Sequence, residues 1–302
     1  MLMASPLFTE FLCRVYLGLG DPPLSVADPQ IEYLFKPNQH LRRFGNHVDY
    51  NAWSMRSEDF PVPKSRRQEL RVMVFGDSVI NGGALTDQRD IATSILQRQL
   101  GTMLSRPIIV GNISAGSWGP PNMLAYARRF GLFQADLVVI VLSSHDYADT
   151  PTFAPTVGVH PDFPDHRPWC ATWEAVTRYL PRYFPQPKTN PGEPATQAPS
   201  QADVETALAA LGELIRLAKD SGAKVLLAQH LERAELPPGR LQEGHAAIAK
   251  VARENGVEPF DIEGNEASAA LYRDNIHPNQ AGQALIARRL LSAIRDAVHP
   301  AN

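Results

Sequence analysis

Five short apolar runs alternate with longer amphipathic segments along most of the chain. The runs are continuous, as in strands buried on both faces, and cover residues 71–75, 107–113, 136–142, 224–229 and 257–262. Each run is followed along the chain by a segment in which apolar residues have the spacing of an amphipathic helix. These segments cover residues 90–104, 120–133, 204–222, 241–254 and 277–298. Strands that alternate with helices predict a parallel sheet covered on both faces, an α/β fold.

Helix-end signals agree with this division. Pro120 and Pro278 fall where a first helical turn is expected, a position that tolerates a missing N–H. Gly222 stands at the end of the helical pattern of residues 204–222, where a glycine is a typical helix stop signal. The sequence therefore predicts the last helix to begin at residue 277.

Residues 151–200 interrupt the alternation. They hold 11 of the 26 prolines, together with several aromatic residues. A long insertion inside a compact domain is typical of a lid, a binding loop or a disordered segment. We expect residues 151–186 to be ordered and to cover a site, and residues 187–202 to be flexible.

Residues 1–69 precede the first strand, and we expect them to form an N-terminal extension that packs on or near a main domain of residues 70–302. Apolar residues recur at positions 7, 8, 11, 12, 15, 16 and 19, the spacing of an amphipathic helix. We expect this helix to dock on the protein's own core, with a membrane surface or a partner as the alternative.

Charge and cysteine content exclude several function classes. A net charge of −3 gives no basic surface for nucleic acid. Cys13 and Cys170 cannot form a disulfide framework, although one bridge between them is compatible with the sequence. No apolar run reaches the ~20 residues that span a bilayer, and the first residues lack the pattern of a secretory signal. We expect a cytoplasmic location, with a periplasmic or membrane-associated one as the alternative.

The first strand leads into the sequence FGDSVINGG, which places Ser78 just after a buried strand. Active sites of open α/β sheets lie at the carboxyl edge of the strands. A serine hydroxyl becomes a useful nucleophile only when a base removes its proton. The sequence should therefore supply a histidine from elsewhere, oriented by an acceptor.

The sequence DNIHPNQAG, just before the last helix, supplies that pair. Asp274 and His277 lie three residues apart, so the carboxylate can accept from one ring nitrogen while the other faces a substrate. Either fragment alone is compatible with a turn or a helix cap. Their joint occurrence, after the first strand and before the last helix, favours a nucleophile with its base and acid.

These motifs resemble those of the SGNH/GDSL hydrolases. That family carries a GDS block after its first strand and a DxxH block near its C-terminus, which match residues 76–78 and 274–277. Its glycine block is similar to residues 111–122, and its GxND block corresponds to SSHD at 143–146. The resemblance spans residues 70–298. It implies a three-layer α/β/α fold with a mostly parallel, flavodoxin-like five-stranded sheet.

The resemblance also assigns roles to individual residues. It implies a Ser78–His277–Asp274 triad, with an oxyanion hole formed by the backbone amides of Ser78 and of Gly116 or Ser117. His145 stands where the family has an asparagine that donates to the oxyanion. A neutral imidazole can donate one hydrogen bond, so we expect His145 to be an oxyanion donor or substrate contact. The alternative is a loop histidine paired with Asp146.

No cofactor is expected. His145, Asp146 and Asp149 carry metal-ligating groups, but a metal site would need a further ligand, so we expect no metal. A strand-linked GxGxxG motif, a GxxxxGK[ST] loop and the GxSxG elbow of α/β-hydrolases are all missing from the sequence.

The leading functional hypothesis is a serine esterase acting on a small-molecule or glycan ester. The acyl group is expected to be short, with O-acetyl groups on carbohydrate as one substrate class, because the aromatic insertion could stack on sugar rings. Two alternatives remain open: an O-acyltransferase that passes the acyl group to a polysaccharide hydroxyl, and a non-catalytic carbohydrate-binding module.

Overall fold

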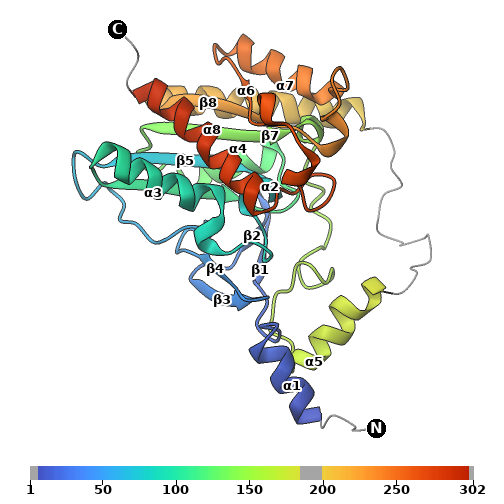
Figure 1. Cartoon of the computed structure of the whole chain (residues 1–302). Coiled ribbons are helices and arrows are strands. Elements are labelled where there is room, and N and C mark those ends of the chain that lie inside the picture. The colour runs from blue at the N-terminus through green and yellow to red at the C-terminus, as the bar shows by residue number, and fades with distance from the viewer. Residues whose placement is uncertain (1–5, 184–198, 299–302) are drawn as a thin grey trace.

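The computed structural model describes residues 6–183 and 199–298, and its centre is a five-stranded parallel sheet (Figure 1). The strand order is β6-β5-β7-β8-β9, and every neighbouring pair is parallel. The strands are β5 (Leu70–Gly76), β6 (Ile108–Ser114), β7 (Leu137–Ser143), β8 (Lys224–His230) and β9 (Phe260–Asp261). This arrangement confirms the expected α/β fold.

Helices cover both faces of the sheet, as Figure 1 shows. The long helices are α3 (Ala92–Leu104), α4 (Pro120–Phe130), α6 (Gln201–Asp220), α7 (Glu243–Glu254) and α8 (Gln280–Val298). Along β5, Val72 and Val74 pack in a core with residues of α3 and α8, whereas Met73 and Phe75 pack in a second core with residues of α4 and α6. Alternate side chains of one buried strand thus enter two separate cores, which gives three layers.

Several predicted boundaries are wrong, among them those of the last strand and the last helix. The last strand was expected over 257–262 but contains only residues 260–261, the two that pair with β8. Helix α8 begins at Gln280 rather than at 277. Pro278 lies before the helix, in an isolated bridge with Tyr272, so His277 stands in a loop that this bridge closes.

The segment predicted to be flexible, residues 187–202, is only partly described. Residues 187–198 lie outside the described ranges. Residues 201–202 form the first turn of α6, which the sequence predicted to begin at 204. Ser200 caps this helix by accepting a hydrogen bond from the Asp203 backbone N–H, as N-cap serines commonly do.

The N-terminal residues form two antiparallel hairpins against the layered body. The hairpins are β1 (Ser25–Asp28) with β2 (Glu32–Phe35), and β3 (Gln39–Arg43) with β4 (Asn46–Tyr50). Tyr33 and Leu34 belong to the same core as Phe75. The fully buried Arg56 donates to the carbonyls of Asn81 (2.5 Å) and Thr86 (2.6 Å), in the loop that follows Ser78. The extension therefore supports that loop directly.

Helix α1 (Pro6–Val15) lies beside α5 (Ala171–Glu174), apart from the layered body (Figure 1). Its buried contact is a small cluster of Cys13, Leu19 and Ala171, while Leu7 and Phe8 stay exposed. The helix therefore packs on the insertion of the same chain and not on the two cores of the sheet. Cys13 and Cys170 are free thiols. No helix among the described residues is long and apolar enough to cross a membrane.

Glu10 attaches α1 to the insertion. Its carboxylate accepts hydrogen bonds from the backbone N–H groups of Ala171 and Thr172, both at 2.9 Å. Burial alone would raise the pKa of Glu10, but these hydrogen bonds together with Thr172 and Arg14 side chains lower it to about 2. The ionised Glu10 therefore stabilises the contact between α1 and the insertion fully above the ordinary carboxyl pKa of ~4.3. This stabilisation is lost as the pH falls through 2.

This attachment predicts a local pH effect. Amide hydrogen exchange of residues 6–15, measured relative to β5 between pH 5 and 2 (roughly the window set by the two pKa values), is expected to rise as the pH falls. In a Glu10→Gln variant the exchange is expected to be high at the upper pH already and to change less. Equal profiles for the two proteins would contradict this role of Glu10.

Candidate active site

Ser78 stands at the carboxyl edge of the sheet. Strand β5 ends at Gly76, and the short helix α2 (Ser78–Asn81) begins two residues later. Asp77 caps this helix, because its Oδ1 accepts from the Val79 backbone N–H at 2.8 Å. The cap turns the chain sharply after the strand and presents Ser78 at the start of the helix.

His277 lies between Ser78 and Asp274. Its Nε2 is 2.9 Å from Ser78 Oγ, and its Nδ1 is 2.8 Å from Asp274 Oδ2. The second carboxylate oxygen, Oδ1, accepts from the backbone N–H groups of Ile276 and His277. Burial alone would raise the pKa of Asp274, but these hydrogen bonds and His277 lower it, so the carboxyl group stays ionised. The structure thus brings Ser78 next to the Asp274–His277 pair, which lies almost 200 positions later in the sequence.

The segment that carries His277 rests on a buried charged group that sequence reasoning missed. His230 Nε2 is 2.8 Å from the Ile276 carbonyl, and its Nδ1 is 2.6 Å from Glu263 Oε1. Burial alone would lower the pKa of His230, but Glu263 raises it. Tyr272 stacks on the His230 ring and donates to the Leu231 carbonyl. The available signal was position, since His230 is the last residue of a strand, at the edge where the site lies.

Ser78 and His277 line a cavity of about 550 Å³. Aromatic residues from two distant segments form part of its wall: Tyr33 and Phe35 come from the N-terminal extension, and Phe163 comes from the insertion. Polar groups in the same wall include Asn81, Asp162 and Arg273. The insertion therefore lines the cavity that holds Ser78, as the sequence suggested, and the N-terminal extension lines it too.

The two candidates for the oxyanion amide lie in different places. Gly116 lines the cavity with Ser78, and its carbonyl accepts from the Tyr33 hydroxyl at 2.5 Å. Ser117 is exposed, with φ of +57°, and is not part of the cavity wall. Of these two candidates, Gly116 is the one that lies in the cavity wall with Ser78.

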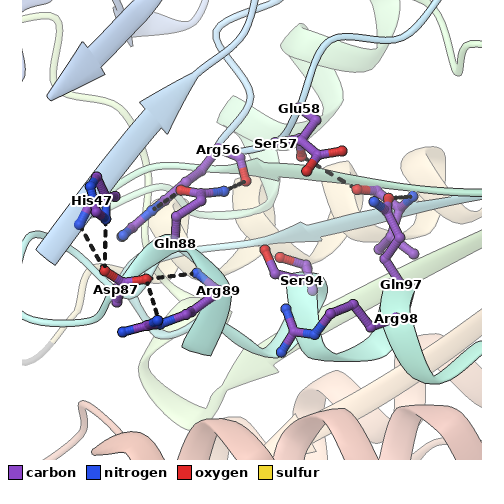
Figure 2. Close-up of a pocket in the computed structure, with 12 residues that line it drawn as sticks. His47, Arg56, Ser57, Glu58, Asp87, Gln88, Arg89, Ser94, Gln97 and Arg98 are labelled. Atoms are coloured by element: carbon purple, nitrogen blue, oxygen red, sulfur yellow. Dashed lines mark hydrogen bonds and ion pairs between the residues drawn. The ribbon is translucent and has the colours of Figure 1, made fainter.

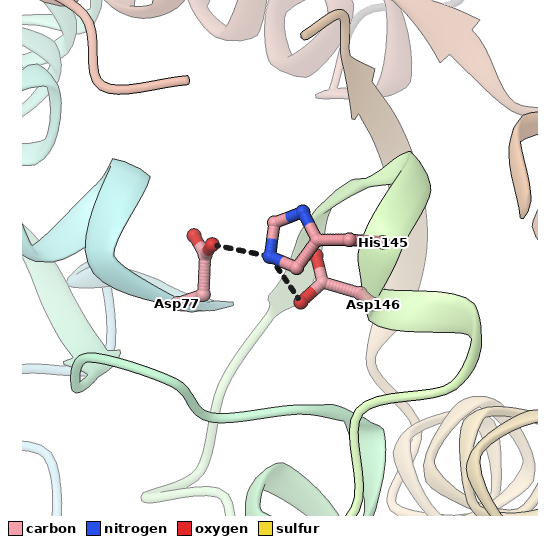
Figure 3. Close-up of side chains that lie close together, drawn as sticks. All are labelled: Asp77, His145 and Asp146. Atoms are coloured by element: carbon pink, nitrogen blue, oxygen red, sulfur yellow. Dashed lines mark ion pairs between the residues drawn. The ribbon is translucent and has the colours of Figure 1, made fainter. Parts of the chain in front are cut away.

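His145 is surrounded by carboxylates. It belongs to a short 3-10 helix, Ser144–Tyr147, that follows β7. Figure 3 shows Asp77 and Asp146 joined to the same ring nitrogen, Nε2, and both carboxylates lie 3.6 Å from it. Asp149 Oδ2 is also 3.6 Å from Nε2, and Glu232 Oε1 is 3.2 Å from Nδ1. Both ring nitrogens therefore face carboxylates, which the sequence did not predict.

These carboxylates perturb one another and the ring. Burial alone would lower the pKa of His145, but Asp146, Glu232 and the other carboxylates raise it to about 11. Burial and the neighbouring Asp77 raise the pKa of Asp149 to about 6, against the opposing effect of His145. Burial also raises the pKa of Asp146. The cluster holds more negative charge than one imidazolium can balance.

Residues 74–285 match the model of the GDSL-like lipase/acylhydrolase family. The chain belongs to this family. The resemblance seen in the sequence is thereby confirmed, and the protein is a carboxylic ester hydrolase. The motifs at residues 76–78 and 274–277 both fall within the match, and so does the atypical SSHD segment.

Several solved structures are similar to this GDSL-like hydrolase. An acetyl xylan esterase, AlAXEase, is 15% identical and has a TM-score of 0.48, with 74% of this chain and 100% of that chain covered. TesA is 18% identical, with a TM-score of 0.48 and coverage of 74% and 98%. The psychrotrophic esterase EstA from Pseudoalteromonas sp. is 14% identical, with a TM-score of 0.46 and coverage of 76% and 98%. No curated protein sequence matches the chain at a significant level.

A second hollow of this GDSL-like hydrolase, of about 310 Å³, lies away from Ser78 (Figure 2). Its wall includes Arg56, Asp87 and Ser94. Asp87 accepts hydrogen bonds from the backbone N–H groups of His47 and Arg89, and Arg56 is bound to carbonyls of the loop after Ser78. Asp87 and Arg56 thus have structural partners in this hollow, and they hold the extension against the main domain.

Proposed function

We propose that the protein hydrolyses short-chain acyl esters through a Ser78–His277–Asp274 triad. The observation that carries the proposal is the continuous contact from Ser78 Oγ to His277 Nε2 and from His277 Nδ1 to Asp274 Oδ2. Such a chain lets the imidazole accept the serine proton while the carboxylate holds its orientation and stabilises the imidazolium. The contact also argues against a purely carbohydrate-binding role.

The mechanism has two halves that use the same groups. His277 Nε2 takes the Ser78 proton as Oγ attacks the acyl carbonyl, and the tetrahedral intermediate collapses when His277 returns the proton to the leaving alcohol. In the second half, His277 takes a proton from water, the hydroxide attacks the acyl-enzyme, and Ser78 recovers its proton as the carboxylic acid leaves. Backbone amides of Ser78 and Gly116 hold the oxyanion in both halves.

The cavity wall supports a sugar ester as the substrate class. Phe35 and Phe163 are partly exposed apolar rings in the wall that also holds Ser78, and Arg273 is a polar group in the same wall. Aromatic faces with a few polar groups suit a ring that carries both C–H and hydroxyl groups. We therefore infer an O-acetyl group on carbohydrate as the preferred ester.

The experiment uses p-nitrophenyl esters of increasing chain length, followed by an acetylated oligosaccharide. Hydrolysis that is fastest for acetate, together with a fluorophosphonate adduct on Ser78, is the expected result. An added glycan acceptor distinguishes transfer from hydrolysis, because acetyl groups on the acceptor instead of free acetate would identify an O-acyltransferase. A wild-type protein without ester cleavage and without a labelled serine would refute the proposal.

The oxyanion role predicted for His145 makes a separate, testable claim. If its ring donates to the oxyanion, His145→Ala is expected to lower kcat by about 10²–10³ with little change in KM, and His145→Asn is expected to recover part of the loss. The measurement is steady-state kinetics on the best p-nitrophenyl ester. A similar kcat for the alanine and asparagine variants would exclude direct donation.

A further inference from the structure

His145 Nε2 is equidistant from three carboxylate oxygens and hydrogen-bonded to none of them. Asp77 Oδ2, Asp146 Oδ1 and Asp149 Oδ2 all lie 3.6 Å from this nitrogen. An N–H group bonds one acceptor well at ~2.7–3.2 Å, and a contact of 3.6 Å falls outside that range. A hydrogen bond from Nε2 to one of these oxygens therefore does not account for the arrangement.

Two of these oxygens accept no hydrogen bond among the described residues. They are Asp77 Oδ2 and Asp146 Oδ1, and both side chains are at least 98% buried. The other oxygen of each carboxylate is occupied, since Asp77 Oδ1 accepts from the Val79 N–H and Asp146 Oδ2 from the Ser143 N–H. These backbone bonds fix both carboxylates with the unpartnered oxygen directed at Nε2, as Figure 3 shows. Carboxylate oxygens that are buried without a donor normally have a cation as partner.

We infer that His145, Asp77 and Asp146 form a binding site for a divalent transition-metal ion of the Mn²⁺ or Zn²⁺ type, and that Asp149 joins them as a fourth ligand when its partly exposed side chain turns toward the ion. Metal–ligand bonds of ~2.0–2.2 Å place neighbouring tetrahedral ligand atoms ~3.4 Å apart, close to the spacing seen around Nε2. The ligand atoms of Asp77, His145 and Asp146 lie within 4.8 Å of one another, a distance that one ion can span.

The donor set restricts the ion. Imidazole favours zinc, iron, nickel and copper, whereas carboxylates favour magnesium, calcium and manganese. One imidazole with three carboxylates therefore suits a borderline ion such as Zn²⁺ or Mn²⁺ better than Mg²⁺ or Ca²⁺. A divalent charge also offsets the excess negative charge of the cluster.

Glu232 completes the arrangement from behind the ring. Its Oε1 lies 3.2 Å from His145 Nδ1, so in a metal-bound ring Nδ1 would keep its proton and donate to Glu232, while an ion would displace the proton from Nε2. A carboxylate behind a metal-binding histidine fixes the tautomer and the ring orientation in this way. The same Glu232 oxygen accepts from the His145 backbone N–H at 3.1 Å, which ties the side chain to the loop.

The loop that supplies three of the ligands is held rigidly by close backbone contacts. A Cβ atom on Gly244 of α7 would lie 1.8 Å from the Ser144 carbonyl oxygen, and one on Gly119 would lie 2.1 Å from the Asp149 carbonyl oxygen. Only glycine permits these approaches. The ligands are therefore positioned in advance, which lowers the entropic cost of binding an ion.

The site joins the nucleophile segment to this loop. Asp77 caps the helix that begins at Ser78, so an ion bound to Asp77, His145 and Asp149 would fix the turn that presents the serine. The sequence motif HDYAD lacks one ligand for a metal site. Asp77, almost seventy residues earlier, supplies it.

The test is direct binding to the full-length chain after removal of metals with a chelator. Isothermal titration with Zn²⁺ or Mn²⁺ is expected to give one site, and His145→Ala and Asp149→Asn are each expected to weaken it at least 100-fold. Glu232→Gln should weaken it by about 10–100-fold, the usual effect of losing the carboxylate behind a ligand. Co²⁺ should give a visible absorption band that the His145→Ala variant lacks.

Matched controls keep the result independent of folding and of ester cleavage. His40 and Asp49 form another His–Asp pair, on the β3–β4 hairpin, so His40→Ala and Asp49→Asn should bind the metal as the wild type does. Ser78→Ala should also bind normally, whatever its effect on hydrolysis. The inference is overturned if the wild type binds neither ion, or if folded His145→Ala and Asp149→Asn proteins, checked by circular dichroism, bind as tightly as the wild type.

Discussion

Replacing Ser78 with alanine is expected to lower kcat/KM for a short-chain p-nitrophenyl ester by about 10⁴–10⁶-fold. The reason is that Ser78 Oγ and His277 Nε2, 2.9 Å apart, act on the same proton. His277→Ala should cause a similar loss, and the Ser78→Ala/His277→Ala double variant should be no slower than either single variant. Asp274→Asn should cost about 10⁴-fold, because the ring loses the acceptor that holds its tautomer.

Steady-state kinetics with the four variants would check this set. Ser94→Ala is the control, since Ser94 lines the hollow away from the nucleophile and its variant should react like the wild type. Losses in the single variants that multiply in the double variant would show that Ser78 and His277 act independently. That outcome would contradict the proposed triad.

Glu174→Gln is expected to destabilise the protein by about 3–5 kcal/mol, because it leaves the Arg43 guanidinium buried without its carboxylate. The two side chains are 5% and 1% exposed, and Arg43 Nη2 lies 2.5 Å from Glu174 Oε1. Glu174 Oε2 accepts from the Gly20 N–H at 2.6 Å as well. The pair joins the N-terminal extension to the insertion, the two segments that line the cavity with Ser78.

Guanidinium denaturation measures the loss, and hydrogen exchange of residues 171–179 locates it. Glu213→Gln is the matched control, because Glu213 pairs with Arg128 on the surface, where such pairs contribute ~0–1 kcal/mol. Losses of equal size in the two variants would show that the buried Arg43–Glu174 pair stabilises the protein no more than a surface pair does.

The residues of the proposed triad could be predicted from the sequence, because each stands in a short motif next to a strand or helix. GDS follows the first parallel strand, and DNIH precedes the last helix. Parallel strands carry their carboxyl ends to one edge, so the two motifs were expected to meet there. His230 and Glu263 had no such motif. Their 2.6 Å contact depends on where β8 and β9 end relative to the His277 segment.

Local sequence patterns did not predict which residues line the cavity. Tyr33 and Phe163 lie in segments without periodicity, and their edge-to-face contact, with centroids 4.8 Å apart, forms only when the extension and the insertion pack together. The packing of α1 on the insertion could not be predicted for the same reason. Amphipathic spacing indicates that a helix has an apolar face, but it does not say what covers that face.

The sequence by itself determined the alternation of strands and helices, the family, and the motifs that hold the proposed triad, since periodicity and short motifs are properties of neighbouring residues. The tertiary structure alone decided the surroundings of His145. Asp77 and Glu232 reach its ring from other elements, and only the folded sheet edge brings four carboxylates around one imidazole. Contacts between residues of separate elements have no local pattern, because their geometry exists only after the strands have aligned.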